Sequence, residues 1–152
     1  MRPQNRQGLE PAATNRSART LASMTASFLA LGDQPFVSLT TFRRSGEPVS
    51  TPVWIGRDRD ELIVLTPTDS GKVKRIRNSG RVELRLCNRR GKVPDDVVTH
   101  AGTARIVTDE PARRATELIR QKYGVEFRIV MLIERVVARG RKPRVILAID
   151  GG

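Results

Sequence analysis

The spacing of apolar positions changes from helical to strand-like near Phe36. Before that point, apolar residues recur at intervals of three and four, at Leu21, Met24, Phe28 and Leu31. This spacing predicts a short helix that ends at Gly32. Residues 1–19 have few large apolar side chains and many Arg, Asn, Gln and Ser residues, so we expect a flexible basic tail. A single domain is then predicted over 20–152.

Six later segments alternate apolar and polar residues or are rich in β-branched residues, as strands are: 36–42, 48–55, 61–66, 81–87, 97–107 and 144–149. Residues 56–60 have the composition of a turn. Pro52 has no N–H for a sheet ladder, which predicts an edge strand. Gly102 predicts a bulge or a close backbone approach. These features predict a mainly β, α+β fold: a small six-stranded antiparallel barrel decorated by helices.

Three helical segments interrupt the strands. A basic helix is predicted after Thr66, started by Asp69 or Ser70 and ended between Asn78 and Gly80. Another is expected to run from Asp109 to Tyr123 with Gly124 as its stop. An apolar segment over 125–139 is predicted as a further helix.

Positive charge is concentrated around the basic helix. The chain has 28 basic and 16 acidic residues, a net charge of +12. Within 66–92 we find nine basic residues, Lys72, Lys74, Arg75, Arg77, Arg81, Arg85, Arg89, Arg90 and Lys92, against Asp69 and Glu83. A lysine in the first turn of a helix is mildly unfavourable by itself, but favourable beside a bound anion. Two interpretations remain open: an anion site at the helix start, or a solvated basic face.

Composition excludes several other functions. One cysteine forms no internal disulfide, and one cysteine with one histidine builds no His/Cys metal cluster within a chain, so no metal is expected. No apolar run reaches the roughly 18 residues needed to cross a membrane, and no secretory signal begins the sequence. We therefore expect a cytoplasmic protein without a membrane partner. Six aromatic residues offer few stacking platforms, which argues against nucleic acid.

An ordered set of segments resembles the pyridoxamine 5′-phosphate oxidase-like superfamily of split-barrel flavin and deazaflavin oxidoreductases, and within it the actinobacterial F420-dependent enzymes. These segments are Ser-Leu-Thr-Thr-Phe-Arg at 38–43, Gly-Glu-Pro-Val at 46–49, Thr-Pro-Val-Trp at 51–54, Ser-Gly-Lys-Val-Lys-Arg-Ile-Arg at 70–77, Cys-Asn-Arg-Arg-Gly at 87–91 and Gly-Thr-Ala at 102–104. The match covers about residues 36–107 well and the remainder loosely.

The resemblance implies an FMN-binding split barrel that forms a homodimer, with a cofactor groove at the subunit interface. In such proteins the Thr-Pro-Val-Trp strand lies along the cofactor ring, and the start of the basic helix holds its phosphate. Ring contact is therefore expected from Thr51, Pro52, Val53 and Trp54. The phosphate side is expected to comprise Thr66, Ser70, Gly71, Lys72, Lys74 and Arg75.

The resemblance favours coenzyme F420 over FMN because of the complete 70–77 segment and the surplus of basic residues. F420 has an oligoglutamate tail, for which Arg57, Arg59, Arg89 and Arg90 are candidate contacts. Taken one by one, each of them is more often simply an exposed surface arginine. FMN remains the alternative because both cofactors bind this fold.

The function implied is hydride transfer from reduced F420 to an unsaturated small molecule, with the chemistry supplied by the cofactor. His100 is a candidate proton donor, although a lone histidine in a strand is more often structural. Cys87 is expected to be an inert thiol and Tyr123 a packing residue. Two alternatives remain: an FMN-dependent oxidoreductase, and a basic protein that binds a cofactor or nucleic acid without turnover.

Overall fold

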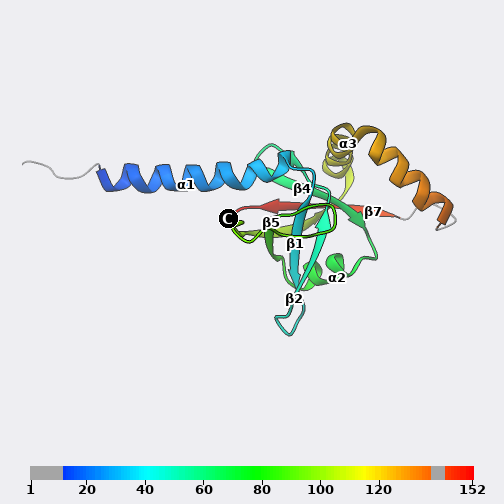
Figure 1. Ribbon diagram of the computed structural model, residues 1–152, viewed down its shortest axis with the longest axis horizontal. Helices are drawn as coiled ribbons and strands as arrows, with labels where there is room; N and C mark the ends of the chain where they lie inside the picture. Colours follow the sequence, from blue (N-terminus) through cyan, green and yellow to red (C-terminus); the bar gives the residue numbers. More distant parts are fainter. Residues whose placement is uncertain (1–11, 138–142) are drawn as a thin grey trace, which may run out of the picture.

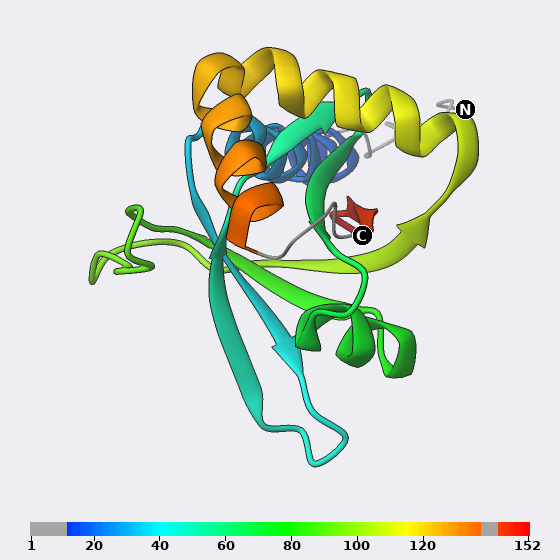
Figure 2. The same ribbon diagram turned by 90° about the vertical axis from the view of Figure 1, so that its right-hand side faces the viewer.

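The computed structural model describes residues 12–137 and 143–152. Within them, one antiparallel sheet contains seven strands in the order β2-β1-β5-β6-β7-β4-β3. The strands are β1 Val37–Phe42, β2 Pro48–Val53, β3 Gly56–Asp58, β4 Glu61–Pro67, β5 Arg81–Leu86, β6 His100–Val107 and β7 Arg144–Asp150. The sheet curls into an open barrel with β2 and β3 at its two edges (Figure 2). The mainly β, α+β fold is confirmed, and so is the edge position of the Pro52 strand.

The predicted number of six strands was wrong because part of 56–60 is a strand. Gly56 to Asp58 form β3, which pairs antiparallel with β4, and the turn is confined to Arg59 and Asp60. Arg59 has a φ of 57°, in the left-handed region that tight turns use. A strand of three residues is too short for an alternating pattern to reveal it.

The sheet has a buried cluster on each face. The inner cluster fills the barrel with side chains such as Leu39, Val64, Leu84 and Leu147. The outer cluster is smaller and joins Ile63 and Ile146 of the sheet to Ala115 and Ile119 of a helix. Strand β4 contributes to both clusters because successive side chains point to opposite faces.

Three α-helices lie among the described residues: α1 Ala12–Ala30, α2 Gly71–Asn78 and α3 Asp109–Val137. A 3₁₀ turn, η1 Leu31–Asp33, follows α1. Helix α1 projects from the barrel (Figure 1). It starts inside the segment predicted as tail, so 12–19 is helical, while 1–11 lies outside the described residues.

Only the last turn of α1 packs on the barrel. Phe28 and Leu29 are buried, but Leu21 and Met24 are 65% and 63% exposed. Of the four apolar residues whose spacing predicted this helix, Phe28 and Leu31 are buried and the other two are not. Helical spacing identifies an apolar face, but it does not say whether the same chain covers that face.

Two predictions about glycine are confirmed. A Cβ added to Gly102 would lie 2.8 Å from the carbonyl oxygen of Asp150, which is too close for any side chain. Gly124 divides α3 with φ 51° and ψ −119°, a conformation that favours glycine. The two halves of α3 therefore run in different directions over the sheet (Figure 2). The predicted end of the second helix at Arg139 lies outside the described residues.

Candidate functional site

Helix α2 begins as the sequence predicts, with Ser70 as its cap. Ser70 has extended backbone angles, and its Oγ accepts a hydrogen bond from the Val73 amide at 3.4 Å. Val73 and Ile76 are buried, which anchors the helix to the barrel. The first turn of α2 is thereby held beside the end of β4.

A polar cluster surrounds this helix start. The Thr66 hydroxyl is buried and lies 3.3 Å from the Ser70 hydroxyl, while Lys72 Nζ donates to Thr66 Oγ1 at 3.4 Å. Burial, and then the charge of Arg75, lowers the pKa of Lys72. The structure gives Lys72 no ion pair with a described carboxylate. A bound anion would compensate both influences on this ammonium.

Arg75 extends the cluster toward β1. Its Nε donates to the buried Thr41 hydroxyl at 2.7 Å, and burial followed by the charge of Arg43 lowers its pKa. A Cβ on Gly71 would lie only 2.9 Å from Arg75 Nη1. The glycine therefore leaves the guanidinium room at the helix start. Thr41 was not among the predicted site residues, because its sequence neighbours give no sign that α2 reaches it.

Lys74 does not join this cluster in the described structure. It is exposed and makes no side-chain hydrogen bond or ion pair with a described residue, whereas Thr66, Ser70, Gly71, Lys72 and Arg75 come together. Helical geometry explains the difference, since residues 72 and 74 are about 200° apart around the axis.

The predicted ring strand is open on one side. Within the described residues β2 pairs only with β1, where Thr51 opposes Leu39 and Pro52 opposes Ser38. Val53 is buried in the barrel core, so its backbone rather than its side chain is free to meet a ligand. Pro52 is exposed. The roles assigned to these residues stay predictions.

Trp54 leaves the strand and packs against α3. Its ring is stacked on Tyr123 at 4.5 Å between centroids with an angle of 13°, and on Phe127 at 6.1 Å. The outer cluster therefore holds this indole. The contacts of Trp54 within this chain are therefore packing contacts, and its contact with a cofactor ring stays a prediction.

Two neighbouring residues of α3 bind the backbone around Trp54, a feature that the sequence reading missed. Lys122 Nζ donates to the carbonyl oxygens of Gly32, Gln34 and Ile55 at 2.6, 2.6 and 2.5 Å. The Tyr123 hydroxyl accepts from the Ile55 amide at 2.9 Å and donates to Pro35 O at 2.8 Å. Burial raises the pKa of Tyr123 to about 12. We call Lys122 and Tyr123 the α3 latch; Tyr123 is a packing residue, as predicted, with an additional polar role.

The predicted arginines occupy different places. Arg89 forms an ion pair with Glu126 of α3 at 2.9 Å, and its loop lies beside β2, since a Cβ on Gly91 would be 3.2 Å from Pro52 Cδ. Arg57 Nε donates to Arg59 O in the β3–β4 hairpin. Arg90 is exposed. No described contact joins any of them to the α2 cluster.

His100 is only partly buried, on the face of the sheet that carries the inner cluster. Its ring meets Phe28 edge-on at 6.3 Å, and burial lowers its pKa. Across the sheet, His100 pairs with Leu84, Leu84 with Leu39, and Leu39 with Thr51. These three pairings separate His100 from Thr51 by about 14 Å along the sheet. These contacts fit a structural histidine. Burial raises the pKa of the Cys87 thiol, as expected for an unreactive cysteine.

Residues 12–137 and 143–152 lack two further features. No helix there is both long and apolar enough to cross a bilayer. No group of three or more His, Cys, Asp or Glu residues in these ranges is arranged to hold a metal ion.

A curled antiparallel sheet of seven strands, with a cationic helix start beside the end of β4, is the architecture of the split-barrel class. The family model described as pyridoxamine 5′-phosphate oxidase matches residues 24–151. The chain therefore belongs to the pyridoxamine 5′-phosphate oxidase family, which confirms the resemblance seen in the sequence.

Solved structures show the same fold. A conserved hypothetical protein from Mycobacterium tuberculosis matches with a TM-score of 0.57 and 19% identity, over 97% of this chain and 84% of that one. An F420 reductase matches with a TM-score of 0.54 and 19% identity, over 81% of this chain and 91% of that one. HutZ, the heme storage protein of Vibrio cholerae, matches with a TM-score of 0.58 and 9% identity, over 88% of this chain and 89% of that one. A comparison with curated protein sequences gave no significant match.

Proposed function

We propose that this protein is an F420-dependent oxidoreductase that reduces an unsaturated small molecule. The observation that carries the proposal is the α2 cluster, where Lys72 and Arg75 lie beside two hydroxyl groups with burial lowering the pKa of each cation. Such a site favours a phosphate, because a phosphate accepts several charge-assisted hydrogen bonds at once. The F420 reductase among the solved structures supports this choice.

The residues present fit the phosphate end of the cofactor. Ser70 Oγ, the free amides of the first turn and Lys72 Nζ would hold the phosphate, and Arg75 would place a second cation beside it. The exposed side of β2 would lie along the ring through its backbone. When bound, the reduced deazaflavin supplies the hydride, so the protein needs to position the two reactants and to exclude water.

FMN and heme are the competing ligands, since FMN shares this fold and HutZ is a heme storage protein. F420 is favoured over FMN because its acidic tail matches a chain with a net charge of +12. Histidine ligation of heme would require His100, the one histidine of the chain, whose ring packs edge-on against Phe28.

Titration of the purified protein with F420, FMN and hemin in parallel tests this proposal. The binding of F420 and FMN is followed by cofactor fluorescence, and the binding of hemin by visible absorbance. We expect the tightest binding for F420, with an affinity that falls as salt increases, because charged contacts dominate. Tighter binding of FMN or hemin than of F420 would make that ligand the cofactor in place of F420. Failure to bind any of the three would overturn the enzyme proposal.

We further propose that the protein is a homodimer. Six exposed apolar residues lie on the second half of α3: Val125, Ile129, Leu132, Ile133, Val136 and Val137. Spacings of three and four place them along one side of the helix. An apolar stripe of this extent is unusual on a monomer and indicates a protein interface. A second copy is the occupant expected from the dimers of this family.

Replacing Ile129 by glutamate should convert the dimer into a monomer. Ile129 is 52% exposed, so the substitution is compatible with the folded chain but places a charge in the proposed interface. Light scattering should give twice the 16.9 kDa of one chain for the unchanged protein and one chain mass for the variant. Arg113→Glu, exposed on the first half of α3, is the control and should remain dimeric. A monomeric unchanged protein would contradict the proposal.

A further inference from the structure

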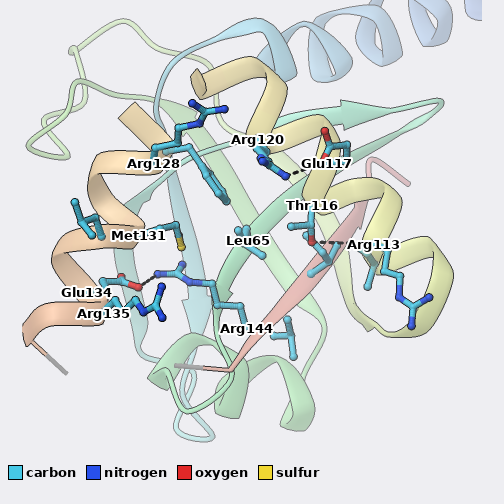
Figure 3. Close-up of a pocket in the computed structure, with 15 residues that line it drawn as sticks. Leu65, Arg113, Thr116, Glu117, Arg120, Arg128, Met131, Glu134, Arg135 and Arg144 are labelled. Carbon is cyan, nitrogen blue, oxygen red and sulfur yellow. Dashed lines mark hydrogen bonds and ion pairs between the residues drawn. The ribbon is translucent and has the colours of Figure 1, made fainter. Parts of the chain in front are cut away.

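The kinked helix α3 forms a groove with the outer face of the sheet. The groove has a volume of about 800 Å³, and Figure 3 shows side chains from both halves of α3, from β4 and from β7 around one shared space. Fifteen residues line it.

The change of direction at Gly124 creates this groove. The first half of α3 packs on the sheet through Ala115 and Ile119, while the second half crosses toward the start of β7. A Cβ on Gly124 would meet no atom within 4 Å, so its left-handed φ of 51°, and not crowding, accounts for the glycine.

The floor of the groove is apolar. It consists of Leu65 from β4, Ile146 from β7, and Phe127 and Met131 from the second half of α3. Leu65, Phe127 and Met131 are only partly buried, so they have apolar surface that no described residue covers. A ligand with an apolar body would cover it favourably, because removing apolar area from water lowers the free energy.

The rim of the groove is strongly basic. Five arginines line it, Arg113, Arg120, Arg128, Arg135 and Arg144, against two acids, Glu117 and Glu134. Arg144 is paired with Glu134, and Arg120 lies 3.6 Å from Glu117. Arg128 and Arg135 are exposed and form no ion pair with a described residue. The surplus charge therefore lies on the second half of α3, on two arginines about two helical turns apart and beside the apolar floor.

We propose that this groove binds an amphipathic anion, with an apolar chain or ring system on the floor and a carboxylate or phosphate head at the basic rim. Apolar floor and cationic rim select for both parts of such a molecule. A wholly polar anion would leave the floor uncovered, and a neutral hydrocarbon would leave the arginines without a partner.

This site is separate from the α2 cluster. Leu65 and Thr66 are neighbours on β4, so their side chains point to opposite faces of the sheet. Thr66 belongs to the polar cluster at the start of α2, and Leu65 to the groove. The proposal therefore holds whether or not the protein binds F420.

Trp54 provides a reporter for the groove. It is the one tryptophan of the chain, and its ring is stacked on Phe127, which lines the groove. A ligand that contacts Phe127 should alter the fluorescence of Trp54 without any turnover. Calorimetry in parallel measures the affinity independently of this reporter.

The test compares four probes that share a ten-carbon chain: decanoate, decyl phosphate, decanol and decyltrimethylammonium, all below their micellar concentrations. We expect decanoate and decyl phosphate to bind with one site per chain, decanol more weakly, and the cation least. The double variant Arg128→Ala, Arg135→Ala should weaken binding of the two anions by on the order of tenfold and leave decanol unchanged. The stronger of the two anions identifies the head group.

The matched control removes two arginines elsewhere. Arg16→Ala, Arg19→Ala lowers the net charge by the same amount on the exposed part of α1 and should bind the anions as the unchanged protein does. Equal losses in both double variants would overturn the proposal, because net charge alone would then explain the binding. Equal binding of the cationic probe would overturn it as well. If the two anions bound only to the monomeric Ile129→Glu variant, a second copy of the chain would fill the groove in the unchanged protein.

Discussion

Replacing Lys72 by alanine should weaken the binding of F420 by about ten- to a hundredfold, the cost of one charge-assisted hydrogen bond to a phosphate. Lys72 is half-buried, with Thr66 as its one described hydrogen-bond partner, and burial lowers its pKa. Fluorescence titration of F420 with both proteins measures the effect. The same substitution should weaken the binding of FMN if FMN is the true cofactor, because both cofactors have a phosphate.

The pH dependence follows from the direction of that pKa shift. A lysine whose pKa is lowered loses its proton at a lower pH than an exposed lysine does. Affinity for the phosphate should therefore fall as the pH rises through this lowered pKa, and Lys72→Ala should abolish that part of the dependence. Arg77→Ala is the control, since Arg77 is exposed in the last turn of the same helix. Equal affinities of the Lys72 and Arg77 variants would remove the α2 cluster from the binding site.

Replacing Lys122 by methionine should lower the free energy of unfolding by roughly 2 kcal/mol. The substitution removes three hydrogen bonds to the carbonyl oxygens of Gly32, Gln34 and Ile55. Hydrogen bonds to a charged group are each worth about 1.5–3 kcal/mol, but the exposed side chain of Lys122 retains contact with water, so the sum is discounted. Urea denaturation followed by Trp54 fluorescence measures the change, because the latch lies next to that ring.

Two further variants make this prediction specific. Tyr123→Phe should cost about 1 kcal/mol, since it keeps the ring that stacks on Trp54 and removes the hydroxyl bound to Ile55 and Pro35. Gln121→Met, on the exposed side of the same helix, should change stability by less than about 0.5 kcal/mol. If Lys122→Met were no more destabilising than Gln121→Met, the latch would have no energetic role.

Much of the candidate site could be predicted from local chemistry. Ser70 follows a strand and precedes a basic amphipathic segment, which is sufficient to place the cap and the helix start. Pro52 identifies its strand as an edge because the missing N–H is a property of the residue itself. Gly124 divides α3 for a similarly local reason. The partners of these elements were harder to predict, since Thr41 and Arg75 meet across 34 positions of sequence.

Local sequence therefore determined the helices, most of the strands, the edge position of β2 and the cationic start of α2. These features depend on backbone preferences and side-chain periods that act within a few residues. The tertiary structure alone decided that Lys122 and Tyr123 bind the chain beside Trp54, that Leu21 and Met24 remain exposed, and that arginines of α3 surround an apolar groove. Each of these results depends on which distant segment lies opposite a given face, and an apolar or charged pattern specifies the face without specifying its partner.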